Sequence, residues 1–314
     1  MLLFHRMKVL VVCRGTSGRI SPFVREQVDS IRKRGIECDY YLIDSKGIFG
    51  YLKNRRGLIN KVEEFCPDII HAHYGLSGLL ANLQRRIPVV TTYHGSDINH
   101  SKAFRFSKWA IRLSKHNILV SQKIFDKTVK YSKNISLIPC GVDLDLFRPI
   151  DKREAMCRTN MDTEKHSVLF ASAFSNRVKN SELAKEAVAM LSDVELIELK
   201  GYTREQVMCL MNAVDLCLMT SYTEGSPQFI KEAMACNCPI VSVDVGDVSE
   251  VIDGVEGCYL TSYAPQDVAS NISKAIAFGQ KTNGREKLEK YGLELDSVAE
   301  RVINVYNTVL NMHR

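Results

Sequence analysis

Two glutamates eight positions apart lie on either side of a predicted helix start. An apolar strand over 214–219 comes first, after which Ser226 suits the N-cap and Pro227 suits the first helical position. The free amides and the positive dipole end of such a helix bind an anion such as a diphosphate. Glu224 precedes the helix and Glu232 lies inside it, so their carboxylates should stand roughly 10 Å apart.

This arrangement suits a nucleotide sugar laid across the helix start. Carboxylates accept hydrogen bonds from hydroxyl groups, so one glutamate can hold the sugar and the other the ribose. Gly225 and Ser226 then line the anion site between them. The plainer alternative is that Glu232 is a surface helix residue and Glu224 a loop charge.

A second group of candidates lies in the first half of the chain. Gly15 and Gly18 form a glycine-containing turn after the first predicted strand, where a ligand can approach the backbone closely. Their spacing does not match a dinucleotide-binding fingerprint. His94 follows a strand over 87–92 and should point into a cleft between two predicted domains. We expect only one of His71 and His73 to do the same. The alternative for each histidine is a hydrogen-bonded structural role.

Strands and helices that alternate along the chain must position these residues. Strands are predicted at 7–13, 37–43, 68–73, 87–92, 117–121, 135–139, 166–173, 194–200, 214–219, 239–244 and 257–261. Helical patterns lie between them, at 22–34, 180–191, 203–213, 226–236 and 265–278. Short buried strands separated by helices indicate parallel sheets, in which ligands bind beyond the carboxyl ends of the strands.

The strand series restarts after a proline and a charged stretch, which indicates a linker. We therefore predict two doubly wound Rossmann-like α/β domains that face a central cleft. The first covers residues 1–148 and the second 149–294. A terminal helix over 295–314 should cross back onto the first domain and couple the two lobes.

Charge is distributed unevenly between the two halves. Residues 1–150 carry 25 Lys and Arg against 12 Asp and Glu, a net charge of +13, while residues 151–314 carry 17 against 24, a net charge of −7.

The ten cysteines include no Cys-x-x-Cys pair, and we expect reduced core thiols in a cytosolic protein rather than disulfides or a zinc site. No apolar run is long enough to span a bilayer.

Five stretches together resemble the motifs of glycosyltransferase family 4, which has the GT-B fold. The segment from Glu224 to Glu232 resembles its E-x7-E motif. The other stretches, in chain order, are Pro67–His73, Thr92–Asp97, Pro139–Pro149 and Asn176–Asn180. Cys140 stands where the family usually has Asn, and Ala173–Ser175 replaces the usual glycine-rich phosphate turn. The resemblance extends over nearly the whole chain.

The resemblance implies a role for each matching residue. Glu224 should contact the hydroxyl groups of the donor sugar, Glu232 the ribose and His94 the transferring sugar. Lys179, with Arg177, should neutralise the diphosphate, because the leaving group gains negative charge as the glycosidic bond breaks. The base should be held near Gly201 and Tyr202, largely through backbone groups. Gly15, Gly18 and His73 would line the acceptor side.

The function implied is that of a retaining hexosyltransferase that needs neither a metal nor a cofactor. It would move a sugar from a nucleotide diphosphate donor to a glycan or lipid-linked acceptor, in surface polysaccharide or glycolipid synthesis. A nucleotide-sugar epimerase of the same shape and a non-catalytic nucleotide-sugar binder are the alternatives. We assign Asp143 and Asp145 a turn or cap role, although they spell the D-x-D of metal-dependent glycosyltransferases. No nucleic-acid partner is expected.

A basic stretch between residues 102 and 133 suggests a further partner. Lys108, Arg112 and Lys115 fall at helical spacing beside Phe104 and Trp109, and a basic amphipathic helix can lie on an anionic membrane. A second basic stretch covers 46–56. The alternative is that the apolar residues pack inward and the charges form a solvated face.

Overall fold

The computed structural model describes residues 6–15, 19–45, 47–161 and 164–312, which form two compact units. Unit 1 consists of Met1–Gly141 together with Leu295–Arg314, and unit 2 of Val142–Glu294. The division falls at Gly141, whereas the sequence placed it after residue 148. The segment 142–148 belongs with unit 2 because Phe147 is fully buried in the core of that unit. Gly141 itself passes so close to the chain at Leu295 that an added Cβ would lie 3.0 Å from the Cα atom there.

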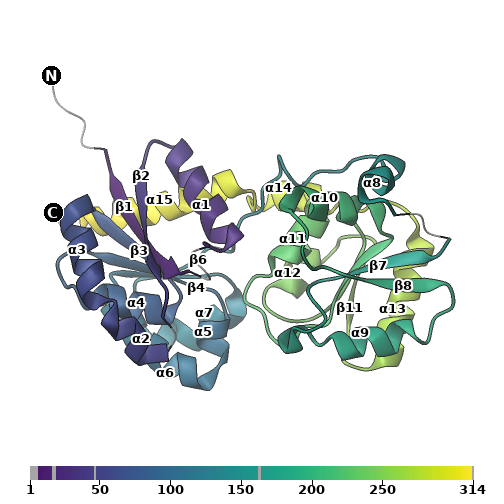
Figure 1. Ribbon diagram of the computed structural model, residues 1–314, viewed down its shortest axis with the longest axis horizontal. Helices are drawn as coiled ribbons and strands as arrows, with labels where there is room; N and C mark the ends of the chain where they lie inside the picture. Colours follow the sequence, from purple (N-terminus) through teal and green to yellow (C-terminus); the bar gives the residue numbers. More distant parts are fainter. Residues whose placement is uncertain (1–5, 16–18, 46, 162–163, 313–314) are drawn as a thin grey trace. The chain divides into compact units, whose positions relative to one another are not determined.

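Unit 1 contains one six-stranded parallel sheet with the order β2-β1-β3-β4-β5-β6 (Figure 1). Its strands are β1 (Lys8–Arg14), β2 (Glu37–Ile43), β3 (Ile69–His73), β4 (Val89–Tyr93), β5 (His116–Leu119) and β6 (Ile135–Leu137). Its helices are α1 (Pro22–Lys33), α2 (Gly47–Lys53), α3 (Arg55–Phe65), α4 (Gly75–Asn82), α5 (Ser96–Asn99), α6 (Ser101–Leu113), α7 (Gln122–Thr128), the 3-10 turn η1 (Val129–Tyr131) and α15 (Leu295–Asn311).

The alternating side chains of β1 divide the core of unit 1 into two layers. Val9 and Val11 pack with α1 and with the terminal helix α15, whereas Leu10 and Val12 pack with α2, α3 and α4. The terminal helix is fixed to α1 by Ser30, whose hydroxyl donates to Asp296 at 2.7 Å. Val298, Val302, Val305 and Val309 of this helix are buried in the same layer, so α15 completes the core of the first unit.

Unit 2 contains a five-stranded parallel sheet with the order β11-β10-β9-β7-β8 (Figure 1). Its strands are β7 (His166–Phe170), β8 (Val194–Glu198), β9 (Leu216–Met219), β10 (Ile240–Val243) and β11 (Cys258–Thr261). Its helices are α8 (Lys152–Thr159), the 3-10 turn η2 (Arg177–Lys179), α9 (Ser181–Val188), α10 (Arg204–Ala213), α11 (Gln228–Ala235), α12 (Val248–Ile252), α13 (Pro265–Phe278) and α14 (Gly284–Lys290).

Every predicted strand is present, in the predicted order, although most are shorter at their ends. The predicted strand over 166–173 ends at Phe170, and the residues that follow leave the sheet. In the same way β9 ends at Met219 and β10 at Val243. The segments after these carboxyl ends carry the donor-site candidates, as a doubly wound sheet requires.

Other features of the chain fit a reduced protein without a membrane-spanning helix. The ten cysteines are free thiols, and burial raises the pKa of Cys13 to about 11. Across the described ranges, we find no helix with the length and apolar character needed to cross a bilayer.

The two aspartates of the D-x-D sequence form a turn, in which Asp143 accepts from the backbone amides of Asp145 and Leu146 at 3.0 and 2.9 Å.

Candidate functional site

The donor-site candidates of unit 2 meet at the carboxyl edge of its sheet. Lys179, in η2 after β7, donates to Glu224 over 2.6 Å. The side chain of Lys179 is 21% exposed and that of Glu224 is 16% exposed, so the pair is largely shielded from water. The structure therefore brings together two of the predicted residues, Lys179, expected at the diphosphate, and Glu224, expected at the donor sugar.

Backbone contacts between two loops hold this ion pair in place. The hydroxyl of Thr220 is within donating distance of two carbonyl oxygens, that of Lys179 at 3.0 Å and that of Asn180 at 2.9 Å. Asn180 has the left-handed conformation, with φ 55°, and turns the chain from η2 into α9. The amide of Tyr222 donates to the carbonyl of Val178. Arg177, at the start of η2, is exposed.

Glu232, the second glutamate, is buried within α11 and pairs with a residue that sequence reasoning missed. Arg204, the first residue of α10, donates to its carboxylate over 2.6 Å. The guanidinium of Arg204 also lies 4.6 Å from the ring centre of Phe147. Arg204 comes directly after Gly201, Tyr202 and Thr203, where the base is expected. Gly201 has a φ of 81°, and Tyr202 is exposed.

The start of α11 differs from the prediction. The helix begins at Gln228 with Pro227 at the N-cap, so the assignment of Ser226 to the N-cap is wrong. The Ser226 hydroxyl is used elsewhere, because it donates to Asp247 over 2.6 Å and accepts from Lys231. Gly225 instead meets the loop after β10, where a Cβ added to Gly246 would lie 2.5 Å from its carbonyl oxygen.

Lys231 is the second residue that sequence reasoning missed. Its side chain is fully buried on the inner face of α11, and its ammonium donates to Asp247 over 2.9 Å. A buried ammonium is stable only when paired, so Lys231, Ser226 and Asp247 fix the two loops at the helix start. The signal in the sequence is a single lysine within the apolar run from Phe229 to Ala235.

The candidates of unit 1 form a buried group of imidazoles. His73 Nδ1 lies 3.0 Å from His94 Nε2, and the two rings stack with centres 5.2 Å apart. His71 is hydrogen bonded on both nitrogens, to Tyr306 at 2.6 Å and to Thr92 at 2.8 Å. His71 therefore has the structural role, and His73 is the residue that contacts His94.

Alternation along the strand does not separate His71 from His73, although it is His73 that hydrogen bonds to His94. The ring centres of His71 and His73 are 4.5 Å apart on one side of the sheet, since residues two apart on a strand share a face. Burial lowers the pKa of His73 to about 3 and the pKa values of His71 and His94 well below their usual value. All three rings are therefore neutral at neutral pH.

Asp97 organises the turn that carries His94. Its carboxylate accepts from the amides of His94 and Gly95 at 3.1 and 3.0 Å and from the amide of Gly75 at 3.0 Å. Burial raises the pKa of this carboxyl to about 6. Gly95 has a φ of 104°, a conformation that glycine adopts readily. Cys140 lies beside the same histidine, with Sγ 3.8 Å from His94 Nδ1.

The predicted glycine turn is described only in part. Gly15 is buried at the end of β1, and its amide donates to the carbonyl of Ile43 over 3.1 Å. An added Cβ there would meet Asp44 Oδ1 at 3.2 Å, so the position has little space for a side chain. Gly18 lies outside the described residues. Within the described residues, no cluster of His, Cys, Asp and Glu has the geometry to hold a metal ion.

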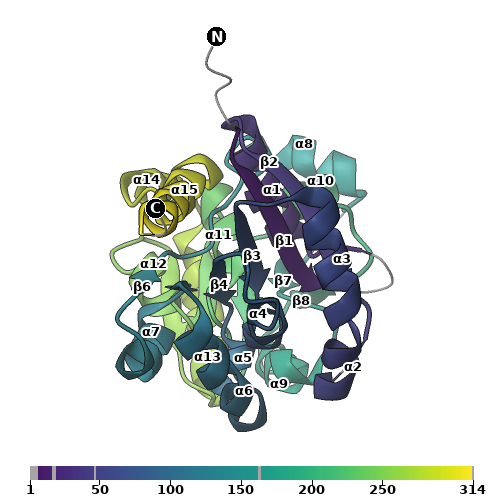
Figure 2. The same ribbon diagram turned by 90° about the vertical axis from the view of Figure 1, so that its left-hand side faces the viewer.

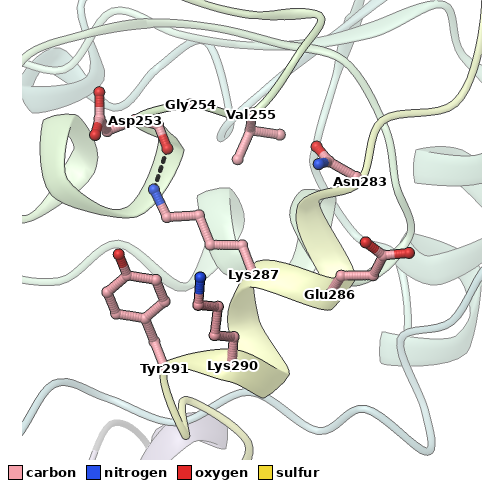
Figure 3. A pocket seen from close by; sticks show the side chains of 8 residues that line it. All are labelled: Asp253, Gly254, Val255, Asn283, Glu286, Lys287, Lys290 and Tyr291. Atoms are coloured by element: carbon pink, nitrogen blue, oxygen red, sulfur yellow. Dashed lines mark hydrogen bonds between the residues drawn. The ribbon is translucent and has the colours of Figure 1, made fainter.

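A cavity of about 300 Å³ in unit 2 contains none of the predicted residues (Figure 3). It is lined by Asp253, Gly254, Val255, Asn283, Glu286, Lys287, Lys290 and Tyr291. The Lys287 ammonium donates to the carbonyls of Glu250, at 3.1 Å, and of Asp253. It therefore stabilises the carboxyl end of α12, which gives this lysine a structural role.

Comparison with known proteins agrees with the architecture. The model of Glycosyltransferase Family 4 matches residues 4–146, and that of Glycosyl transferases group 1 matches residues 175–277. Sucrose-phosphate synthase from Thermosynechococcus elongatus superposes with a TM-score of 0.83 at 17% identity, over 98% of this chain and 100% of that one. Anabaena Alr3699/HepE in complex with UDP-glucose gives 0.75 at 17% identity, over 96% and 100%.

Curated relatives cover a smaller part of the chain. A putative teichuronic acid biosynthesis glycosyltransferase, TuaC from Bacillus subtilis, is 27% identical over 68% of this chain and 62% of its own length. A D-inositol 3-phosphate glycosyltransferase from Mycobacterium sp. (strain KMS) is 24% identical over 71% and 62%. The chain thus matches these relatives over about three fifths of their length.

Two parallel sheets with flanking helices define the GT-B class of glycosyltransferase, which confirms the predicted fold. With both family models matched in chain order, the protein belongs to the glycosyltransferases of the family 4 type.

Proposed function

We propose that the protein is a retaining hexosyltransferase that moves a sugar from a nucleotide diphosphate donor to a glycan or lipid-linked acceptor. The observation that carries the proposal is the shielded pair of Lys179 and Glu224 at the carboxyl edge of the unit 2 sheet. HepE, which has the same fold, is described in complex with UDP and with UDP-glucose. We place the donor in unit 2 and the acceptor in unit 1.

In this proposal the Lys179 ammonium exchanges its partner when the donor binds. The diphosphate takes the place of the Glu224 carboxylate beside the ammonium, and this carboxylate then accepts hydrogen bonds from the sugar hydroxyls. As the glycosidic bond breaks, charge develops on the leaving diphosphate. A cation held in place stabilises that charge without reorganisation, so we propose that transfer needs no metal and no cofactor.

The remaining candidates bind or position the donor and the acceptor. The Glu232 carboxylate, held by Arg204 on one oxygen, accepts from the ribose hydroxyls, and the base lies near Tyr202. His94 is neutral and adds no charge beside the transferring sugar, to which it hydrogen bonds in exchange for one of its present contacts, with His73 or with Cys140. We further propose that the reaction belongs to surface polysaccharide or glycolipid synthesis in the cytosol.

Product analysis with a labelled nucleotide sugar tests the proposal. A thermal-shift screen with UDP, GDP and ADP first selects the nucleotide, because a ligand at about a hundred times its dissociation constant adds about 2.7 kcal/mol to the free energy of unfolding. Sugar transfer, or slow donor hydrolysis with retained configuration, supports the proposal. An inverted C2 centre would identify an epimerase, and tight binding without turnover would identify a binding protein.

Glu224→Gln supplies the matched test of the site. Turnover should fall at least tenfold, since the amide weakens hydrogen bonds to the sugar. Affinity for the free nucleotide should not fall, because the ion pair that the substitution weakens is the one that the diphosphate displaces from Lys179. Glu182→Gln is the control, because Glu182 pairs with Lys185 on the surface of the same unit. Parent turnover in Glu224→Gln would show that the assignment is wrong.

A further inference from the structure

Two helices of unit 1 expose large apolar side chains to solvent. Phe49 and Leu52 of α2 are 79% and 43% exposed, and Trp109 and Leu113 of α6 are 58% and 47% exposed. The other large residues of α6 behave differently, since Ile111 is fully buried and packs in the core. Single exposed apolar residues are normal on a soluble protein, but two pairs on helices that both pack against α4 call for an explanation.

Basic residues flank both pairs. The sequence has no Asp or Glu from Ser45 to Val62, and none from Ile98 to Phe125. Six exposed cations on these helices and beside them are Lys53, Arg55, Arg56, Lys102, Arg105 and Arg112. The guanidinium of Arg112 lies 5.7 Å from the ring centre of Trp109, so charge and apolar surface are adjacent. We refer to these four apolar and six basic side chains as the α2–α6 surface.

The α2–α6 surface belongs to a single layer of unit 1. Helices α2 and α6 both pack against α4, on the side of the sheet opposite α1 and α15. Figures 1 and 2 show both helices at the same end of this unit. Helix α2 follows the carboxyl end of β2, and α6 follows that of β4 after the turn that carries His94. Helix α2 and the first turns of α6, with Lys102 and Arg105, thus adjoin the edge at which the acceptor-side residues lie. Trp109 and Leu113 lie in the last turns of α6, which runs back toward the amino ends of the strands.

We propose that the α2–α6 surface docks the protein on an anionic lipid bilayer. Aromatic and aliphatic side chains insert among the lipid headgroups, where their burial is favourable, and Trp is especially suited to this interface. The surrounding lysines and arginines are attracted by anionic headgroups, and together the two signals give stable but reversible attachment. The lack of acidic residues removes the repulsion that such a membrane would otherwise impose.

Docking goes beyond the proposed function and does not require catalysis. It gives that function a location, because a lipid-linked acceptor presents its headgroup at the membrane surface. Helix α2 and the first turns of α6 follow the carboxyl ends of β2 and β4, so docking through this part of the surface brings the carboxyl edge of the sheet close to the headgroups. An acceptor free in solution would require no such surface.

Intrinsic fluorescence tests the proposal directly, because Trp109 is the only tryptophan in the chain. Vesicles of phosphatidylglycerol and phosphatidylcholine at low salt should shift the Trp109 emission to shorter wavelength and protect it from acrylamide. Brominated lipids should quench the emission, and vesicles of phosphatidylcholine alone should give a much smaller change. Added salt should weaken binding, since the Debye length falls to about 8 Å at physiological ionic strength.

An unchanged emission with anionic vesicles at low salt would overturn the proposal. So would a blue shift that grows with protein concentration in the absence of lipid, because that result would show that a second copy covers the surface. Neither outcome depends on sugar transfer. Failure of docking and failure of the proposed function are therefore distinguishable.

Variants separate the apolar and the electrostatic contributions. Phe49→Ser with Leu52→Ser should reduce vesicle binding in sedimentation, and the exposure of both side chains means that the fold is retained. Lys102→Glu with Arg105→Glu should weaken binding by about tenfold or more, given the contribution of each cation near an anionic surface. The control is Arg25→Glu with Lys33→Glu, which changes the net charge by the same amount on the exposed face of α1. This control should bind the vesicles nearly as the parent does. Equal losses in both charge variants would show that net charge, rather than the α2–α6 surface, determines binding.

Discussion

The two groups of candidate residues differ in how they hold charge. In unit 2 each predicted or discovered carboxylate is paired with a cation: Glu224 with Lys179, Glu232 with Arg204 and Asp247 with Lys231. In unit 1 the corresponding group consists of His71, His73 and His94, which burial keeps neutral. The cations that can exchange partners with a diphosphate therefore lie in unit 2.

The difference suggests a division of tasks under the proposed function. A departing diphosphate needs fixed positive charge, which ion pairs at the edge of the unit 2 sheet can supply. A sugar being transferred needs directional hydrogen bonds, which neutral imidazoles supply without attracting or repelling the phosphates. Each experiment below removes one side of this contrast.

The largest effect is expected for Lys179→Ala. Removal of the cation should slow transfer by about 10²- to 10³-fold or more, because charge on the departing diphosphate loses its partner. The measurement is the rate of transfer or hydrolysis of a labelled nucleotide sugar, with and without EDTA. The chelator should leave the parent rate unchanged.

Lys185→Ala is the matched control for this experiment. Lys185 is an exposed lysine of the same unit, three residues from its partner Glu182, so its loss should have little effect. An equal loss of activity in both variants would contradict a specific role for Lys179. A strict requirement for added divalent metal would contradict the metal-independent mechanism.

A smaller effect is expected for Arg204→Ala. Without the guanidinium, the Glu232 carboxylate is no longer held in one orientation, and affinity for the nucleotide should fall about tenfold, which corresponds to about 1.4 kcal/mol. Calorimetry with the selected nucleotide and with its 2′-deoxy analogue measures the change. The preference for the ribonucleotide should decrease, because the ribose hydroxyls lose an oriented acceptor.

Glu232→Ala resolves what a negative result would mean. If Glu232→Ala binds the nucleotide as the parent does, the ribose assignment itself fails. If Glu232→Ala weakens binding but Arg204→Ala changes neither affinity nor ribose preference, Arg204 has only a structural role. Arg204→Lys should recover part of the affinity, since it retains the charge but not the fork of the guanidinium.

The sequence predicted the architecture well because the signals for it are local. Each apolar, β-branched run is one strand, and the helical patterns between them fall where helices form. The ends of strands were less predictable. The predicted strand over 166–173 was too long, since β7 ends at Phe170 and the next three residues, Ala171, Ser172 and Ala173, lie outside it. Where a strand ends depends on its neighbours in the sheet, and the residues of the strand itself do not indicate that position.

The site was predictable where a motif carried it and not where a contact crossed the fold. The pairing of Arg204 with Glu232 joins residues 28 positions apart on two helices, and no spacing rule indicates it. Ser226 looked like an N-cap from its neighbours alone, but Asp247 and Lys231 bind its hydroxyl. A polar side chain with a stronger buried partner does not follow its local preference.

The smallest effect concerns acid stability and applies to the neutral imidazoles of unit 1. Between about pH 3 and pH 6.5 an unfolded histidine binds a proton that buried His73 does not, so the free energy of unfolding falls as the pH falls through this range. Asp97 acts in the opposite direction, because its pKa is raised to about 6 and the folded state takes up its proton first. The lowered pKa values of three imidazoles outweigh the raised pKa of one carboxyl, so unit 1 should lose stability on acidification.

Urea titrations followed by the emission of Trp109 report on this unit alone. The substitution His73→Asn should reduce the loss of unfolding free energy between pH 7 and pH 5.5 by about 1 kcal/mol. His166→Asn, an exposed histidine of unit 2, should keep the parent slope. A His73→Asn slope equal to that of the parent would show that His73 is protonated in the folded protein and would remove the contrast between the two units.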